Sequence, residues 1–265
     1  MNSKAQIVAT IGPATKDKKI IKELIEHKMD VVRLNFSWGT HEEHAQYIKD
    51  IREMAKEVGR NIPIIQDLSG PRVQEEHGHE FQKGAVEVVT EKDLNDLKFG
   101  IEQNVDYVAM SFVGCAADVL GLREKMKEMG KVIPIISKIE RKIALENIDE
   151  IVKVTDAVMV ARGDLGNEVP LEQIPFIEKD IIIKCKAAKK PVIVATQMMY
   201  SMVENPVPTR AEVTDIAFAI LNGADAVMLS DESANGKYPL EAVKMMEKVI
   251  IESEKHLFTS EENSL

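Results

Sequence analysis

The chain has 265 residues, 45% hydrophobic and 29% charged, a balance that is ordinary for a globular protein and excludes a largely disordered one. The formal net charge of −10 argues against a general nucleic-acid or anionic-membrane surface, yet it allows a locally basic pocket. The N-terminal apolar stretch is too short for a signal peptide, and no apolar run approaches membrane-spanning length. We therefore expect a cytoplasmic protein with no nucleic-acid or membrane partner, in which Cys115 and Cys185 are free thiols.

Short apolar runs rich in Val, Ile and Ala alternate along the chain with segments of helical periodicity. The predicted strands are 5–12, 31–36, 62–68, 107–113, 134–140, 157–165, 191–198 and 226–232. The predicted helices are 16–28, 41–58, 91–104, 116–130, 144–154, 173–189, 210–223 and 239–255. Eight buried parallel strands, each followed by a helix, are the number that closes a barrel, so the pattern predicts an α/β protein with a single (β/α)8 TIM barrel. An open, doubly wound sheet is the alternative.

Two of the predicted helices begin with a recognisable capping pattern. In "THEEH", Thr40 can accept a hydrogen bond from the first helical turn while Glu43 reaches back to it. Thr209 and Glu212 repeat the pattern at the seventh predicted helix. Both patterns support the predicted starts of these helices.

One connection is longer than a barrel loop needs. About twenty residues, "SGPRVQEEHGHEFQKGAVEVV", separate the third predicted strand from its helix. The glycines in this stretch favour a turn-rich excursion, either a small hairpin or the remnant of a lid, over a helix. We therefore expect a barrel domain at residues 1–258, with a short excursion at about 72–88, and a polar C-terminal tail at 259–265.

Polar residues stand at the end of every predicted strand, which is where the active site of a barrel enzyme forms. There are too many of them to be accidents of core packing, so they predict an active site at this end of the barrel. They are Thr10, Arg33, Asn35, Ser37, Asp67, Ser111, Lys138, Glu140, Arg162, Asp164, Thr196, Gln197, Ser230, Asp231 and Glu232.

Glu140 and Asp164 follow two adjacent predicted strands. Two carboxylates that face one cavity repel each other unless a cation or a shared proton relieves them, and Mg²⁺ is the usual solution. The alternative is that they form salt bridges with Lys138 and Arg162. The glycines of "ARGDLG" favour the metal site, because residues without side chains let backbone amides approach an anion.

Three further side chains are candidates for chemistry. Lys138 would place an ammonium beside the metal, where it could neutralise charge during phosphoryl transfer or enolate formation; Schiff-base chemistry fits less well, because two nearby acids favour the charged amine. Arg33 could grip a phosphate or carboxylate, with a salt bridge to Asp67 as the alternative. Thr196 is ambiguous on its own, because a threonine at a strand end more often caps a helix or binds backbone.

Eight stretches in order, over nearly the whole chain, resemble the pyruvate kinase family. They are "IVATIGPAT", "VVRLNFSWGTHEEH", "DLSGP", "TEKDLNDLKFGIEQNVDYVAMSFV", "IISKIE", "VMVARGDLGNEVP", "VIVATQMM" and "PTRAEVTDIAFAILNGADAVMLSDESANGKYP". The resemblance covers only the catalytic barrel. Members of the family usually insert a β-rich lid domain after the third strand, where this chain has its excursion, and add a C-terminal regulatory domain.

The resemblance implies a role for each of five residues. Glu140 and Asp164 would hold Mg²⁺ (or Mn²⁺), and Lys138 would contact the phosphoryl group in transit. The amides of Gly163 and Asp164 would bind the carboxylate of pyruvate, and Thr196 would help to pass a proton to the enolate carbon.

The resemblance also implies that Arg33 binds phosphate. Asn35, Ser37, Asp67 and the carbonyl of Leu68 match the site where many members of the family bind K⁺.

The chain departs from the family in the stretch usually written Asp-Thr-Lys-Gly-Pro-Glu-Ile-Arg, which here reads "DLSGPRVQ". Ser69 and Gln74 replace its two basic residues, the second of which normally grips nucleotide phosphates. Arg72 replaces a glutamate, and members with a basic residue there tend not to need K⁺. We therefore expect the cation of Arg72 to make K⁺ dispensable. Trp38 replaces a histidine.

The leading interpretation is a Mg²⁺-dependent, pyruvate kinase-like enzyme that converts phosphoenolpyruvate and ADP into pyruvate and ATP, weakened by the missing lid. A second is a barrel that retains only metal-assisted chemistry on enolpyruvate, pyruvate or oxaloacetate. A third is a non-catalytic protein that binds phosphoenolpyruvate or pyruvate, or assembles with a partner. An engineered truncation and a homo-oligomer both stay open.

Overall fold

The computed structural model describes residues 3–75, 78–81 and 88–257. Eight parallel strands close into a barrel in the order β1-β10-β9-β8-β7-β6-β3-β2, and β2 pairs back to β1. The predicted barrel is thus confirmed, and the open-sheet alternative is wrong. The barrel strands are β1 (Gln6–Thr10), β2 (Val31–Asn35), β3 (Ile64–Asp67), β6 (Tyr107–Met110), β7 (Ile135–Ile139), β8 (Ala157–Ala161), β9 (Val192–Ala195) and β10 (Ala226–Leu229).

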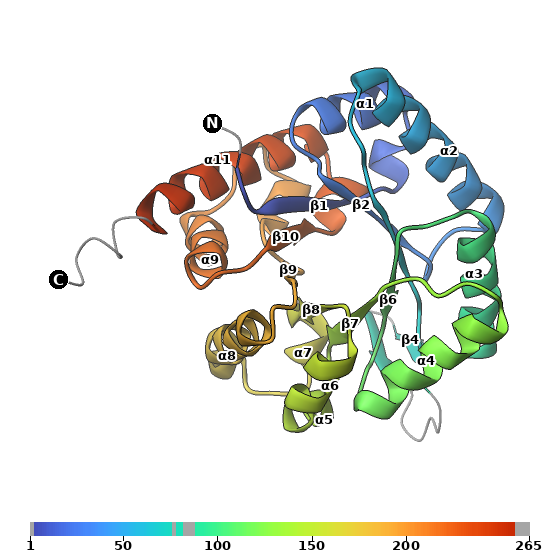
Figure 1. Cartoon of the computed structure of the whole chain (residues 1–265). Coiled ribbons are helices and arrows are strands. Elements are labelled where there is room, and N and C mark those ends of the chain that lie inside the picture. The colour runs from blue at the N-terminus through green and yellow to red at the C-terminus, as the bar shows by residue number, and fades with distance from the viewer. Residues whose placement is uncertain (1–2, 76–77, 82–87, 258–265) are drawn as a thin grey trace.

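The helices surround the strands, as Figure 1 shows. The long ones are α1 (Lys18–Glu26), α2 (His41–Val58), α3 (Glu91–Glu102), α4 (Ala116–Glu128), α8 (Ile174–Ala187), α9 (Arg210–Leu221) and α11 (Pro239–Leu257). The predicted helix 144–154 is instead divided at Asn147 into α5 (Lys142–Glu146) and α6 (Ile148–Val154). The Asn147 side chain donates to Gly114 O at 2.8 Å, which fixes this break against the loop between β6 and α4.

All eight predicted strands end earlier than expected, because the chain turns as soon as it leaves the barrel. Residues 162–165 form the short helix α7 (Arg162–Leu165) rather than the end of β8. Likewise α10 (Asp231–Ala234) follows β10, and a turn follows β9. The 3-10 helices are η1 (Pro13–Thr15), η2 (Leu171–Gln173) and η3 (Tyr200–Val203).

Alternation along each strand divides the core into two layers. One set of buried side chains, among them Val8, Ile65, Ile136, Met159 and Met228, forms a cluster to which every strand contributes. The alternate residues of the strands, such as Ile7 and Ala9 of β1, pack instead with the apolar faces of the helices. The strands are therefore buried on both faces, which accounts for their near-continuous apolar sequence.

Capping contacts fix where the helices start. Thr40 Oγ1 accepts from Glu43 N at 3.3 Å, and Thr40 N donates to Glu43 Oε2 at 2.9 Å. The reciprocal pair of Thr209 and Glu212 is present too, so both predicted capping patterns are confirmed. A third, Thr90 with Asp93, opens α3.

The excursion after β3 contains two short antiparallel strands, β4 (Arg72–Glu75) and β5 (Gly78–Phe81). Of the two forms that the sequence left open, the described part is a hairpin. Residues 76–77 and 82–87 of the excursion, and the predicted tail at 259–265, lie outside the described residues. Where the structure describes the chain, no helix combines the length and apolar character that crossing a bilayer requires. Cys115 and Cys185 are both free.

Two helical glycines test the packing of the barrel. An added Cβ at Gly100, in α3, would stand 1.9 Å from Gln66 Oε1, whereas one at Gly121, in α4, would have no neighbour within 4 Å. We expect Gly121→Ala to raise the free energy of unfolding by about 0.5–1 kcal/mol, because alanine favours the helix. Gly100→Ala should lower it by about 1–3 kcal/mol through overpacking. Urea unfolding followed by circular dichroism measures both, and an increase for both alanines would contradict the packing of α3 on β3.

Candidate active site

The ends of β2, β3 and β7 bring four charged side chains into one buried cluster. Arg33 Nε donates to Asp67 Oδ2 at 2.6 Å. Lys138 Nζ lies 3.2 Å from Asp67 Oδ1 and 2.9 Å from Glu140 Oε1. None of the four residues is more than 8% exposed. Buried charges are tolerated only when they are paired, so these side chains hold one another in place.

Two of the predicted salt bridges at the strand ends are present, and one is replaced by other partners. The salt bridge from Arg33 to Asp67, the alternative to an anion-binding role, is present. Lys138 and Glu140 also pair, because alternation along β7 directs both to the same side of the strand. Arg162 pairs with residues of two outer helices, described below, rather than completing the cluster.

Ser111 connects the cluster to the backbone of the neighbouring strand end. Its Oγ accepts a hydrogen bond from Lys138 Nζ at 2.8 Å and donates to Leu68 O at 2.7 Å. The sequence placed Ser111 at a strand end without giving it a role. The structure adds it as the residue that orients the ammonium of Lys138.

The two acids of the cluster differ in their electrostatics. Burial alone would raise the pKa of Asp67, but the cations of Lys138 and Arg33 outweigh it and hold that pKa below its ordinary value. Burial and the nearby Asp164 carboxylate together raise the pKa of Glu140, and Lys138 opposes them only in part. Its surroundings therefore favour the charged form of Asp67. The charged form of Glu140 needs more nearby positive charge than the described residues supply.

Glu140 and Asp164 fit a divalent cation. Glu140 Oε2 accepts from Phe112 N at 2.6 Å. Glu140 Oε1 is buried and lacks a hydrogen-bond partner among the described residues, since its 2.9 Å contact with Lys138 Nζ is an ion pair without hydrogen-bond geometry. No three His, Cys, Asp or Glu side chains of the described part of the chain converge on one point. Mg²⁺ accepts two carboxylates with water and substrate oxygens in the other positions, so the chemistry of this donor set is compatible with that ion.

The ends of β8 and β9 bring Gly163 and Thr196 together. Gly163 N donates to Thr196 Oγ1 at 2.7 Å, and that hydroxyl donates to Ala195 O at 2.6 Å. Thr196 and Gln197 both have positive φ, 71° and 54°. Such a conformation costs of order 1–3 kcal/mol per residue and persists only where the surroundings impose it. The turn is therefore held in a strained form at the mouth of the barrel.

Arg162 reaches two acids that sequence reasoning missed. Its Nη1 lies 2.6 Å from Asp215 Oδ1 on α9 and 3.1 Å from Glu178 Oε2 on α8. Its Nη2 donates to Thr196 O at 2.9 Å. Glu178 is 1% exposed. A signal for it existed in the helical pattern, where Glu178 shares a face with the buried residues Ile174, Ile181, Ile182 and Cys185.

The residues matched to a K⁺ site lie close together. Asn35 Oδ1 accepts from Ser37 N at 3.1 Å, and Ser37 Oγ is buried without a hydrogen-bond partner among the described residues. Leu68 O already accepts from Ser111, and Asp67 already has two cations. Arg72 contributes a third positive charge that lowers the pKa of Asp67.

Arg72 is held in place by contacts near its own backbone. Its Nε donates to Ser69 O at 2.7 Å, and its guanidinium lies over the Phe112 ring, 5.5 Å from the centroid. A cation over an aromatic face is favourable. These contacts hold the guanidinium of Arg72 in one place. A side chain that replaces a bound cation would need such a fixed position.

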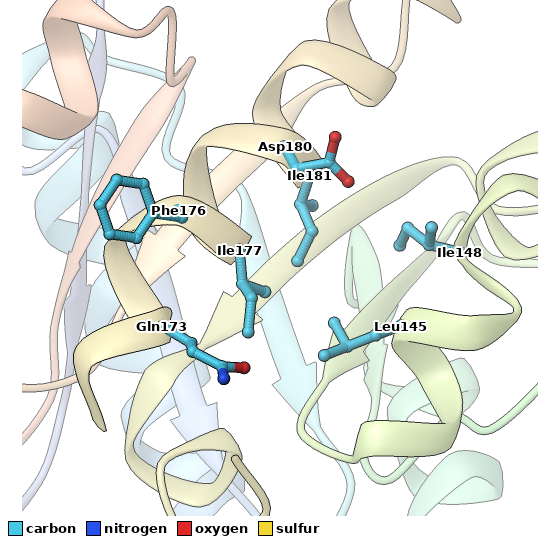
Figure 2. Close-up of a pocket in the computed structure, with 7 residues that line it drawn as sticks. All are labelled: Leu145, Ile148, Gln173, Phe176, Ile177, Asp180 and Ile181. Atoms are coloured by element: carbon cyan, nitrogen blue, oxygen red, sulfur yellow. The ribbon is translucent and has the colours of Figure 1, made fainter. Parts of the chain in front are cut away.

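A cavity of about 300 Å³ lies away from this site. Figure 2 shows this groove between α5, α6 and α8. Leu145 and Ile148 face Ile177 and Ile181 across it. The groove lacks the charged cluster and the glycine amides described above, so we place the chemistry at the mouth of the barrel.

Known proteins resemble this chain over most of its length. Residues 2–89 and 83–243 match the family model for the barrel domain of pyruvate kinase. The pyruvate kinase of Dictyostelium discoideum is 39% identical over 336 positions, which cover 95% of this chain and 66% of that protein. That of Bacillus licheniformis is 37% identical over 340 positions, covering 96% and 58%. That of Agrobacterium vitis is 37% identical over 338 positions, covering 97% and 71%.

These relatives are longer than the chain. It spans 66% of the Dictyostelium protein and 58% of the Bacillus protein. Because 95% of 265 residues is about 252, the 336 aligned positions leave about 84 positions of the Dictyostelium protein without a counterpart here. The two segments of the family match overlap at residues 83–89, so the match is divided at the excursion.

Glu178 gives the stability of the protein a pH dependence. Burial raises the pKa of Glu178 to about 7, with Arg162 opposing and Asp215 adding to the rise, against an ordinary value of 4.5. Between these values the folded protein holds a proton that the unfolded chain has released, so stability falls as pH rises from about 4.5 to 7. Over this range we expect the free energy of unfolding of the wild type to fall by up to about 3 kcal/mol relative to that of Glu178→Gln.

Urea unfolding of both proteins at pH 5 and pH 8 measures this difference. The substitution keeps the shape of the side chain and removes its titration. A gap between the two proteins that stays constant with pH would contradict the buried, protonated state of Glu178.

Proposed function

Because the chain belongs to the pyruvate kinase family, we propose that it transfers a phosphoryl group from phosphoenolpyruvate to ADP, giving pyruvate and ATP, with Mg²⁺ or Mn²⁺ as cofactor. The observation that carries this proposal is the position of Lys138. Its ammonium lies 2.9 Å from Glu140 Oε1 and 3.2 Å from Asp67 Oδ1, at the end of the barrel where Gly163 and Thr196 also meet.

Glu140 and Asp164 would hold the divalent ion, which when bound supplies positive charge for the phosphoryl and enolate oxygens. Lys138 would meet the phosphoryl group in transit. Asp67, Glu140 and Ser111 support that role because they stabilise the ammonium and fix its direction. A preorganised charge needs no rearrangement at the moment of reaction.

Gly163 and Thr196 would act on the other half of the substrate. The amides of Gly163 and Asp164 would bind the carboxylate of pyruvate. The Gly163 amide now donates to Thr196 Oγ1, so a carboxylate that takes this amide would release the threonine hydroxyl. That hydroxyl would then help to pass a proton to the enolate carbon.

Arg33 would contact the phosphate from the opposite side of the cluster. Its Nε is engaged by Asp67 and its Nη1 donates to Thr10 Oγ1 at 3.1 Å. These two contacts orient the guanidinium, which binds phosphate through its remaining N–H groups.

A second candidate is a barrel that performs only metal-assisted enolate chemistry on pyruvate or oxaloacetate. The observation in its favour is the family match, which is divided into two segments at the excursion, together with the about 84 positions of a relative that have no counterpart in this chain. Gln74 also replaces the basic residue that, in the family, normally grips nucleotide phosphates. Proton transfer needs only the barrel, whereas phosphoryl transfer benefits from closure that excludes water.

The test incubates the protein with phosphoenolpyruvate, Mg²⁺ and ADP, follows ATP and pyruvate, and in parallel follows solvent deuterium entering the methyl group of pyruvate. We expect Lys138→Met, which keeps the length of the side chain and removes its charge, to lower ATP formation about 10²- to 10³-fold. Lys142→Ala, an exposed lysine in the same segment, is the control and should be unaffected. Circular dichroism establishes that both variants fold.

The outcomes separate the candidates. ATP formation that falls by this amount in Lys138→Met, and not in Lys142→Ala, supports the kinase. Deuterium exchange without ATP supports the enolising barrel. Ligand binding without either activity would leave a protein that only binds phosphoenolpyruvate or pyruvate.

K⁺ should be dispensable. Arg72 already supplies a fixed cation that acts on Asp67. We expect equal activity in K⁺ and Na⁺ at matched ionic strength, and a requirement for K⁺ to emerge in Arg72→Glu, which removes the cation. A rise in wild-type activity or thermal stability specific to K⁺ would contradict this substitution.

A further inference from the structure

Arg162 occupies a position between the proposed site and the outer helices. It immediately precedes Gly163 and Asp164 in the chain, yet its side chain contacts α8 and α9, which surround the barrel (Figure 1). The side chain is 9% exposed, and its guanidinium contacts two acids, the backbone carbonyl of Thr196 and, at 2.7 Å, Met198 Sδ. The roles proposed above make no use of this buried side chain.

The carbonyl that Arg162 binds belongs to Thr196, one of the two residues of the turn with positive φ. A β-branched residue rarely adopts this conformation, so some contact must impose it. The far end of the turn is fixed by Glu232, whose Oε1 accepts from Met199 N at 3.1 Å. Arg162 Nη2, at 2.9 Å from Thr196 O, is the charged contact at the near end.

We propose that Arg162, held by Asp215 and Glu178, is the positioning residue that fixes the backbone of Thr196, so that its hydroxyl lies beside the Gly163 amide and stays aimed at the substrate once the carboxylate takes that amide. This inference rests on the proposed function for the identity of the substrate. It assigns to α8 and α9 a part in the chemistry, since Glu178 and Asp215 reach the site only through the guanidinium.

Both acids contact the same nitrogen of Arg162. Nη1 of Arg162 is shared by both acids, at 2.6 Å from Asp215 Oδ1 and 3.1 Å from Glu178 Oε2. A single positive charge needs one negative partner. Either acid can therefore hold the guanidinium when the other is neutral, and only the loss of both charges releases it.

The two acids compensate for each other. In Glu178→Gln, Asp215 still pairs with Nη1. In Asp215→Asn, one of the charges that raise the pKa of Glu178 is removed, so Glu178 ionises more readily and takes over the pairing. The double variant leaves Arg162 buried without a counter-charge, which frees Nη2 from Thr196 O.

The experiment compares Glu178→Gln, Asp215→Asn and the double variant at pH 7, well below their unfolding temperatures. We expect a small loss in the kcat for deuterium entry into pyruvate in each single variant. In the double variant we expect a loss of about 10- to 100-fold, beyond the product of the two singles, because the hydroxyl is misplaced. The KM for pyruvate should change less than kcat.

The matched control removes two carboxylates from the same region without touching Arg162. Glu172→Gln with Asp180→Asn does this at exposed positions of η2 and α8. It should leave kcat unchanged. Arg162→Lys keeps the positive charge but not the planar set of N–H donors of the guanidinium, so its loss in kcat should resemble that of the double variant.

A second measurement is independent of activity. The Gly163 amide donates to Thr196 Oγ1, so its hydrogen exchange by NMR should accelerate in the double variant and stay unchanged in the control pair. If wild type shows neither ATP formation nor deuterium exchange, the proposed function fails, and the Gly163 amide alone decides the positioning role. Losses in the double variant that equal the product of the singles, or an unchanged Gly163 amide, would overturn the proposal.

Discussion

The arrangement at the mouth of the barrel depends on the burial of Lys138 between Asp67 and Glu140. A cation and two anions sit where strand ends leave little solvent, and none of the three is more than 4% exposed. A buried charge must be paired, so each side chain fixes the others. Arg33 and Ser111 extend the network to β2 and to the backbone at Leu68. Three strands are thereby locked in the relative positions that a catalytic site requires.

A second buried network lies beside the first and has the opposite orientation. Arg162 points from the end of β8 toward the outer helices, where Asp215 and Glu178 hold it. The first network presents charge to the barrel mouth, and the second fixes the backbone of the turn that carries Thr196. Both follow from the same constraint, because polar groups at strand ends are half enclosed by helices and must find partners there.

Much of the fold could be predicted because it depends on local chemistry. Alternating apolar runs and helical segments gave the eight barrel strands and the helical segments between them, and the caps at Thr40 and Thr209 gave helix starts. The errors lie where the chain leaves a strand. Residues 162–165 have the composition of a strand end but form α7, because beyond Ala161 the backbone loses its barrel partners and turns.

For the site, the sequence by itself determined which residues carry charge at the strand ends, including Lys138, Glu140 and Asp164, since the periodicity of strands fixes where each one ends. Only the tertiary structure decided how those charges are shared. It paired Lys138 with two acids, gave Arg162 to Glu178 and Asp215 on helices distant in sequence, and brought the Thr196 hydroxyl to the Gly163 amide. Partners of this kind depend on closure of the barrel, which sets elements side by side that no spacing along the chain relates.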